Sequence, residues 1–307
     1  MMVFIVRRIL LLIPVGLGVT FLVFSMLHLI PGDPARILAG EAATYEQMEA
    51  VRENLGLNDP FLIQYGRFLI NLLQGDMGMS IRSGRPVAYE IFEIRFMVTV
   101  QLAVLTTAFT TLLGLIMGII SAKFKGAFID TGIMVISLIG FSLPNFWLGI
   151  LIMRFFGVQL GLLPLIGWGT PQQAVMPVLM LSIGGSAVIA RMTRGSLVDV
   201  LSQDYIRTAY AKGLTERVVM YRHALRNALI PVITVVGLQF GGMLSGAMIT
   251  ESIFAINGMG RLIIESIRMR DFPVAQGGIL VAATMFVLVN CLVDILYNIV
   301  NKRIELN

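Results

Sequence analysis

The chain has 307 residues, of which 57% are hydrophobic, and its mean hydropathy is +0.85. Charged residues make up 13% of the chain, whereas roughly 25% is usual in soluble domains. This composition excludes a single soluble domain, a disordered chain and a nucleic-acid-binding protein. The net charge of +5 must be interpreted by location, because bases beside a membrane report orientation. One cysteine, Cys291, excludes a disulfide framework and a multi-cysteine metal site, and two distant histidines argue against a zinc site.

Six stretches approach the roughly 20 apolar residues that an α-helix needs to cross a bilayer. They are Ile9–Ile30, Met97–Ala122, Thr131–Met153, about Ala174–Ala190, Leu229–Thr250 and about Ala275–Val300. The sequence therefore predicts an all-α membrane protein with six transmembrane helices. The first stretch is about 22 residues long, too long for the 7–15 residues of a signal-peptide core, and is predicted to be a retained anchor.

The distribution of Lys and Arg predicts the orientation of these spans. One side holds 13 basic residues, and the other holds four outside the long first loop. Because short loops rich in Lys and Arg stay on the cytoplasmic side, both termini and the loop 191–228 are predicted to be cytoplasmic.

Residues 31–95 form the one long polar stretch, with six Arg, nine acids and a net charge of −3. We expect a small extracytoplasmic helical insertion between a first part, 1–30, and a transmembrane core, 96–307. Thr44 to Gln47 are predicted to form a capping box at the start of a helix that ends at Gly56. A second helix is predicted to run from Asp59-Pro60 to about Leu73. One apolar face is predicted for each helix, namely Tyr45, Met48, Val51 and Leu55, and Leu62, Tyr65, Phe68, Leu69 and Leu72. Packing on the chain's own bundle is favoured over a lid or a docking surface.

The cytoplasmic loop 191–228 is far longer than the 2–8 residues usual between packed helices. Its sequence predicts a short helix, Tyr205–Lys212, capped by Ser202 or Asp204 and ended by Gly213. Tyr205, Ile206, Ala209 and Tyr210 are predicted to share one face. Thr215 and Glu216 then open a basic helix that enters the fifth span near Pro231. An exposed aromatic face needs a partner to cover it, although the basic residues alone would also suit anionic lipid.

Other motifs limit the chemistry. The chain has no phosphate-binding G-x-x-x-x-G-K-[ST] loop and no hydrolase motif, so no catalytic residue is predicted. Asp294 is the one carboxylate within the predicted spans, which argues against coupling to an ion gradient. Glycine pairs at 114/118, 237/241 and 242/246 predict close helix packing, within the chain or against a second subunit. Pro144 must kink or open the third span, for packing or for a transport path, and the path candidates beside it are Asn145, Phe146 and Trp147.

Taken together, these motifs resemble the membrane-spanning permease subunit of peptide-type ABC importers, the dipeptide/oligopeptide/nickel branch. The resemblance covers nearly the whole chain. Its marks are Arg7-Arg8, His28–Pro34, Leu55–Leu57, Gly75–Ser80, Ser142–Trp147, Tyr205–Gly213, Arg222–Asn227 and Pro231.

The most specific mark is similar to the Glu-Ala-Ala loop, by which such permeases insert a coupling helix into their ATPase subunits. Arg207, Thr208 and Ala209 stand where Glu-Ala-Ala is expected, and Gly213 is the motif glycine. Arg207 replaces the acid and the expected proline is displaced to Pro231, as is typical of the peptide branch. The resemblance implies an ATPase-coupling role for Tyr205, Arg207, Thr208, Ala209, Tyr210, Lys212, Gly213, Leu214, His223 and Arg226.

The resemblance also implies the type I importer permease fold, a location in the cytoplasmic (inner) membrane of a prokaryote, and a set of partners. These are a homologous second permease, two cytosolic ATPase subunits that bind ATP and Mg, an extracytoplasmic solute-binding protein and the lipid bilayer. No cofactor, metal or nucleic acid is expected on this chain. The predicted cargo is a short peptide, with glutathione or a nickel chelate as alternatives. An ion-gradient-driven secondary transporter and a membrane scaffold are the alternatives from other classes.

Overall fold

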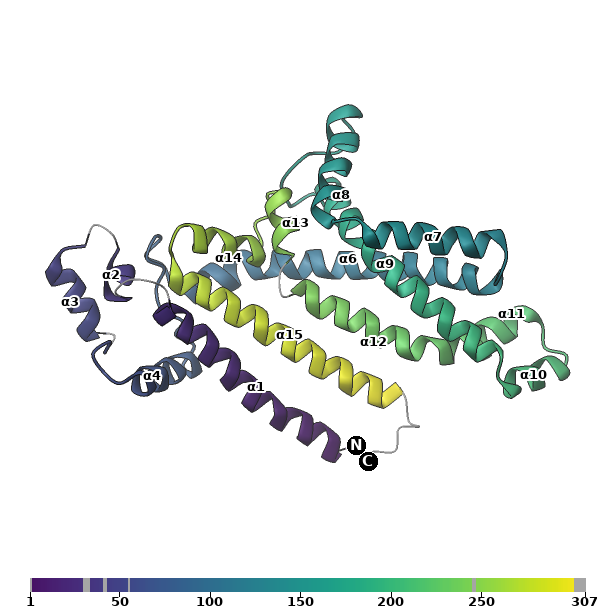
Figure 1. Cartoon of the computed structure of the whole chain (residues 1–307), viewed down its shortest axis with the longest axis horizontal. Coiled ribbons are helices and arrows are strands. Elements are labelled where there is room, and N and C mark those ends of the chain that lie inside the picture. Colours follow the sequence, from purple (N-terminus) through teal and green to yellow (C-terminus); the bar gives the residue numbers. More distant parts are fainter. Residues whose placement is uncertain (1, 30–33, 41–42, 55, 245–246, 301–307) are drawn as a thin grey trace. The chain divides into compact units, whose positions relative to one another are not determined.

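The computed structural model describes residues 2–29, 34–40, 43–54, 56–244 and 247–300 (Figure 1). All regular elements among these residues are helices, and one isolated β-bridge joins Met79 to Pro86. Leu55, the second glycine of the 242/246 pair, residues 31–33 and residues 302–303 lie outside the described part. The described helices form two compact units, one of residues 101–243 with 288–300 and the other of residues 2–100 with 244–287.

The first half of the chain contains seven α-helices and a π-helical turn. These elements are α1 (Met2–Leu29), α2 (Pro34–Ala39), α3 (Tyr45–Asn54), α4 (Phe61–Leu73), α5 (Val87–Tyr89), η1 (Glu90–Phe96), α6 (Met97–Lys123) and α7 (Phe128–Ser142). The second half continues with α8 (Asn145–Ile152), η2 (Met153–Gln159), α9 (Pro171–Leu201), α10 (Asp204–Ala211), α11 (Glu216–Val218), η3 (Val219–Ala224), α12 (Leu225–Leu244), α13 (Met248–Ile253), α14 (Met259–Arg268) and α15 (Phe272–Val300).

The predicted spans are helical, but the structure does not reproduce the predicted count of six. Four continuous helices are long and apolar enough to cross a membrane: Val87–Lys123, Pro171–Leu201, Glu216–Leu244 and Phe272–Ile295. A bent pair, α7 with α8 and η2, makes a fifth if it is one span. The first predicted span corresponds to α1, a helix of 28 residues. The structure therefore supports four or five spans by length, and the predicted six are not all established.

The third predicted span is not one helix, since α7 and α8 meet at an angle of 100°. The break was expected at Pro144, and the structure confirms it. Leu143 leaves the helical conformation with ψ 132°, because a residue before proline is pushed toward extended backbone. Pro144 is the N-cap of α8, a position where the N–H that proline lacks would have no intrahelical acceptor.

The ends predicted for the fourth and fifth spans are wrong. The fourth span was predicted to end at Ala190, but α9 runs through the first eleven residues of the predicted loop to Leu201. Gly185 lies inside α9 and does not end it. Its lack of a side chain lets α6 pack closely there, since a Cβ would lie 2.7 Å from the side chain of Thr110. The fifth span ends at Leu244 rather than Thr250, and α13 begins separately at Met248.

Glycine spacing does mark close packing inside the unit of residues 101–243 and 288–300. A Cβ on Gly114 or Gly118 of α6 would lie 2.6 or 2.5 Å from the side chains of Ile189 or Thr193 on α9. Gly237 and Gly241 of α12 similarly face Val293 and Val289 of α15. Both pairs therefore bring helices of this chain together, whereas Gly242 faces open space.

In the other unit, α4 packs on α1 as predicted. The rings of Phe24 and Phe68 lie 5.4 Å apart, and Tyr65 Oη donates to the carbonyl of Leu17 at 3.0 Å. One predicted member of the α4 face is wrong, because Leu62 is 72% exposed and Phe61 packs on α1 instead. On the face predicted for the preceding helix, Met48 and Val51 are half-buried, whereas Tyr45 is 74% exposed.

The capping box that opens α3 is confirmed. The Thr44 N–H donates to the Gln47 side chain at 2.9 Å, and the Gln47 N–H donates back to Thr44 Oγ1 at 3.3 Å. Both bonds satisfy N–H groups that the first turn of a helix leaves without intrahelical acceptors.

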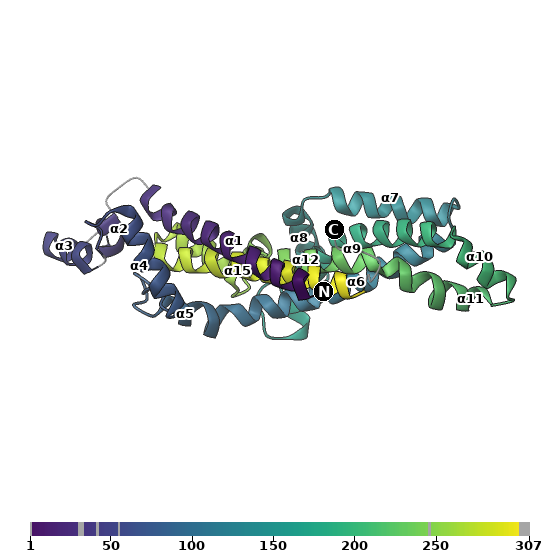
Figure 2. The same ribbon diagram turned by 90° about the horizontal axis from the view of Figure 1, so that it is seen from below.

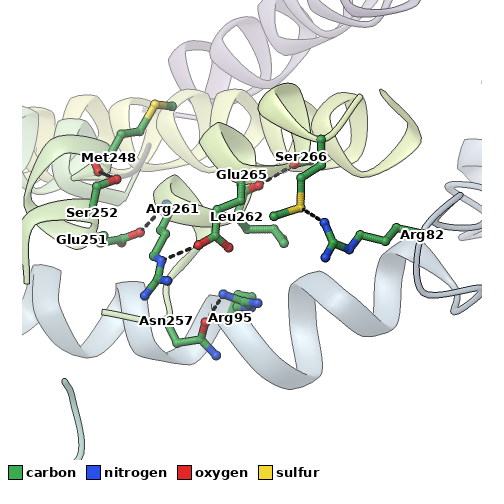
Figure 3. Close-up of polar contacts among 11 residues, drawn as sticks. Arg82, Arg95, Met248, Glu251, Ser252, Asn257, Arg261, Leu262, Glu265 and Ser266 are labelled. Carbon is green, nitrogen blue, oxygen red and sulfur yellow. Dashed lines mark hydrogen bonds and ion pairs between the residues drawn. The ribbon is translucent and has the colours of Figure 1, made fainter. Parts of the chain in front are cut away.

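The same unit buries a carboxylate that sequence reasoning missed (Figure 3). Glu251 of α13 is fully buried and accepts hydrogen bonds from Thr99 Oγ1 at 2.8 Å and from the Arg261 N–H at 2.9 Å. Thr99 Oγ1 in turn accepts the N–H of Met259 at 2.8 Å, so the two side chains cap the start of α14. Gly258 is required there, because a Cβ would lie 2.5 Å from the Glu251 carboxyl. Burial raises the pKa of Glu251, against the opposing effect of these hydrogen bonds.

Candidate coupling site

The short helix predicted in the cytoplasmic loop is α10, Asp204–Ala211. Its N-cap is Gln203, in extended conformation, and neither predicted cap residue caps it. Ser202 instead ends α9 and donates to the Asp199 carbonyl at 2.7 Å. Asp204 is the first helical residue, where its negative charge is favourable beside the positive end of the helix dipole.

Gly213 ends α10 as predicted. Its φ of +77° lies in the left-handed region that favours glycine, and nothing lies within 4 Å of where a Cβ would point. The Gly213 N–H donates to the Tyr210 carbonyl at 2.9 Å, and the Leu214 N–H donates to the Ala209 carbonyl at 3.4 Å. This pair of bonds is the Schellman motif, which reverses the chain after the helix.

One side of α10 rests on a small apolar core, which we call the coupling core. Ile206 and Ala209 are buried there, with 0% and 6% exposure. The other buried members come from the ends of α6, α9 and the α11–α12 segment: Ala122, Leu197, Val219, Met220, Ala224 and Ala228. The predicted four-residue face is therefore split, because the chain itself covers Ile206 and Ala209 but leaves the two tyrosines exposed.

The tyrosines flank this buried pair, and together with the basic side chains of the loop they form an exposed surface on α10. Tyr205 is 41% exposed and Tyr210 is 45% exposed. Asn227 Nδ2 of α12 donates to Tyr205 Oη at 2.8 Å and so holds that ring in place. The other predicted coupling residues Arg207, Thr208, Lys212, Gly213, Leu214 and Arg226 are exposed as well, and His223 is half-buried.

The basic helix after α10 is continuous from Glu216 to Leu244, and Thr215 is its N-cap as predicted. It contains a π-helical turn, η3, that the sequence did not reveal. Such turns occur often at functional sites. Tyr221 of this turn is 59% exposed, and sequence reasoning missed it because the turn has no local sequence signal. In Figures 1 and 2, α10 and α11 lie together at one tip of their unit.

A partly buried ion pair lies close to the coupling core, and sequence reasoning missed it as well. Arg194 of α9 donates two hydrogen bonds to Asp130 of α7, Nε to Oδ1 and Nη2 to Oδ2, both 2.6 Å long. Ser121 Oγ also donates to Asp130, and so does the Gly126 N–H at 2.8 Å. The side chain of Asp130 is only 5% exposed. In the sequence, Arg194 was simply one basic residue of the loop.

The three path candidates occupy the first turn of α8, away from α10 in sequence and on a separate element. Phe146 is 50% exposed and Trp147 is 44% exposed. A Cβ added at Gly184 of α9 would lie 3.9 Å from Asn145 Oδ1, so α8 begins beside α9. Among the described residues, no group of three or more His, Cys, Asp or Glu could hold a metal ion.

Comparison with known proteins gives consistent results. Residues 114–306 match the family described as the binding-protein-dependent transport system inner membrane component, and residues 1–110 match its N-terminal family. The glutathione transport system permease protein GsiC of Pectobacterium atrosepticum is 46% identical, over 99% of both chains. The dipeptide transport system permease protein DppB of Alkalihalophilus pseudofirmus is 42% identical, over 99% of this chain and 100% of that protein.

Two solved structures share the fold at 19% identity. An inward-facing MetNI methionine ABC transporter chain matches 67% of this chain and 94% of its own, with a TM-score of 0.58. A chain of an amino acid ABC transporter with histidines matches 77% of this chain and 98% of its own, with a TM-score of 0.52.

Proposed function

The chain belongs to the family of binding-protein-dependent transport system inner membrane components, and from this premise we propose that it carries short peptides and is driven through α10. The family makes it a multi-pass permease subunit of an ABC importer in the inner membrane, with the type I permease fold and no catalytic role. Membership implies ATPase and binding-protein partners. Family membership argues against the two alternatives from other classes, an ion-gradient-driven transporter and a membrane scaffold.

The proposed cargo is a di- or oligopeptide, with glutathione or a nickel chelate as variants within the same class. Relatives named for dipeptide and for glutathione transport are similarly close, at 42% and 46% identity, so identity does not separate these cargoes. Both named cargoes are small peptides. Binding-protein-dependent uptake of a dipeptide and of glutathione into liposomes, measured side by side with each cognate binding protein, distinguishes them.

We further propose the composition and orientation of the complex. The partners are a homologous second permease, two cytosolic ATPase subunits that hold the ATP and Mg, and an extracytoplasmic binding protein, while this chain binds no cofactor. Both termini face the cytoplasm, a proposal supported by the 13 basic residues assigned to that side.

The observation that carries the coupling proposal is that α10 buries part of its surface within the chain and exposes the rest. Ile206 and Ala209 anchor it on the coupling core, whereas Tyr205 and Tyr210, which flank that pair, stay exposed. Aromatic residues of this kind are common anchors at protein interfaces. A helix that is anchored by its buried residues and still exposes large aromatic side chains is suited to enter a cleft on an ATPase subunit. The nucleotide state of the ATPase would then favour one of two permease conformations.

The α7–α8 break supports the proposal of a path near Asn145, Phe146 and Trp147. Helix backbone is opened at membrane depth only where protein or a water-filled cavity covers it. Trp147→Ala is expected to lower uptake while leaving ATPase assembly intact. Unchanged uptake would remove Trp147 from the path.

Gly213 provides the decisive test of coupling. The complex is reconstituted in liposomes, and ATP hydrolysis is measured with and without cargo-loaded binding protein. Gly213→Pro forces φ to about −65° and removes the N–H donated to Tyr210, so stimulation should fall to the basal rate while the complex stays assembled. Gly213→Asn is the matched control, because asparagine tolerates the left-handed conformation. Full stimulation in Gly213→Pro, or no bound ATPase in the wild type, would refute the proposal.

A further inference from the structure

We propose that Asp130 and Arg194 are positioning residues that transmit movement of α10 to α7 and thus to the break before α8. The inference rests on the proposed function, because it assumes that α10 is the element the ATPase moves.

The pair is built to hold two helices in one geometry. Both carboxylate oxygens of Asp130 accept from Arg194, in the bidentate arrangement that combines strength with directional precision. Ser121 and the Gly126 N–H supply further donors from the end of α6 and the turn after it. With the carboxylate 5% exposed and the guanidinium 29% exposed, solvent screens the pair far less than a surface pair.

The pair belongs to the same packed body as α10. Ser121 directly precedes Ala122, and Arg194 lies three residues before Leu197, one turn along α9. Ala122 and Leu197 are both members of the coupling core that holds Ile206 of α10. Interiors packed in this way transmit displacement rather than absorb it. A shift of α10 therefore reaches the ion pair through direct contacts.

From the ion pair, α7 leads to the path candidates. Asp130 is in the first turn of α7, and Ser142 ends the helix twelve residues later, roughly 18 Å away at 1.5 Å per residue. Along this length α7 packs on α9, where a Cβ on Gly140 would lie 2.9 Å from Ile183. Beyond Ser142 the chain turns by 100° into α8, which begins with Asn145. A helix fixed at its base and hinged at its tip would move the hinge when the base moves.

A second ion pair nearby provides a matched control. Lys123 of α6 and Glu216 of α11 lie 3.6 Å apart, but their side chains are 51% and 62% exposed. Exposed pairs of this kind contribute little and are screened by salt. If transmission needs the buried geometry rather than any charge at this end of α6, only the Asp130–Arg194 pair should matter.

The first measurement is the number of cargo molecules transported per ATP hydrolysed by the assembled importer in liposomes. Asp130→Asn removes the charge, and Arg194→Lys keeps a charge but loses the bidentate fork. Both variants should keep ATP hydrolysis and lower the transport ratio at least about five-fold, whereas Lys123→Gln should match the wild type. A structural role alone would lower hydrolysis and transport together. An unchanged ratio in both variants overturns the inference.

The second measurement tests whether α7 and α10 move as one body. Cys291 is the only cysteine, so Cys291→Ser gives a background for spin labels at Ile136 of α7, 66% exposed, and at Ala211 of α10, also exposed. The distance between the labels should be the same without nucleotide and with ATP trapped, and should broaden in Asp130→Asn. A wild-type distance that changes between the two states overturns the inference, even if neither variant assembles.

The outcomes separate this inference from the proposed function. A wild-type complex without stimulated hydrolysis refutes the coupling role of α10, and the inference falls with it. A coupled wild type with equally coupled Asp130→Asn and Arg194→Lys variants refutes the inference alone.

Discussion

The short helices α10 and α4 are both amphipathic and both lie outside the predicted spans, yet the chain covers their aromatic side chains to different extents. α4 places Phe61, Tyr65 and Phe68 against α1, so its aromatic side is covered by the chain itself. α10 covers only Ile206 and Ala209 and leaves its tyrosines exposed. Aromatic content alone therefore does not mark a docking surface. What distinguishes α10 is that small aliphatic residues anchor it, which leaves the large side chains free.

The α14 helix follows the pattern of α4. Its buried residues include Met259, Leu262 and Ile263, and these pack with α5, η1 and α15. Its N-terminus is capped within the chain by Glu251 and Thr99. In this unit α4 and α14 thus bury one side within the chain, whereas α10 leaves both of its tyrosines exposed. Four predictions test this comparison.

The largest effect is expected from a charge beneath α10. Ile206→Asp places a carboxylate at a site with 0% exposure, at a cost of about 4 kcal/mol or more. α10 should detach from the coupling core, and the ATPase subunits should no longer copurify with the permease. Leu62→Asp on the exposed side of α4, 72% exposed, is the matched control and should copurify normally. Equal losses in both variants would mean that α10 is not a special surface.

A smaller effect is expected when an exposed tyrosine of α10 is removed. Tyr210→Ala should lower binding-protein-stimulated hydrolysis about tenfold, as expected when an interface aromatic worth about 1–2 kcal/mol is removed. The thermal midpoint should barely move, because surface substitutions usually stay within about 0.5 kcal/mol. Tyr45→Ala on α3, at 74% exposure, serves as the control for loss of an exposed tyrosine. Normal stimulation in Tyr210→Ala would show that the exposed ring is not an ATPase contact.

A local effect is expected where α4 meets α1. Tyr65→Phe removes the hydroxyl that donates to the Leu17 carbonyl and also contacts Thr20, a loss of about 1 kcal/mol. Amide hydrogen exchange of α4 should become about five-fold faster, and uptake should be unchanged. A loss of uptake with unchanged exchange would indicate that α4 meets a partner rather than only α1.

The smallest effect is a dependence of stability on pH at Glu251. Its pKa in the folded protein is raised by burial above the ordinary value of 4.5. The folded state therefore binds a proton that the unfolded state releases. The stabilising contribution is complete below the ordinary pKa and is lost as pH rises through the folded pKa. Thermal unfolding of the solubilised complex across this range should show that slope in the wild type and a flatter one in Glu251→Gln. Identical slopes would assign the dependence to other groups.

Much of the coupling site could be predicted from local sequence. The glycine at the end of α10 and the capping residue of the basic helix depend on a few neighbouring residues, and the structure confirms Gly213 and Thr215 in those roles. The cap of α10 was wrong because Ser202 bonds within α9, which extends eleven residues beyond the end predicted for the fourth span. Gly185, inside α9, serves close helix packing rather than termination.

By itself, the sequence determined that this is a helical membrane protein, where its apolar helices lie and where the chain turns. Each of these properties depends on residues within a few positions of one another. Only the tertiary structure decided which side of α10 is covered, how sharply the chain bends at Pro144, and which carboxylates are paired. Asp130 meets Arg194 across 64 positions, and Ser80 donates to Asp271 across 191. Contacts over such separations arise from packing of whole helices, and no local period of the sequence encodes them.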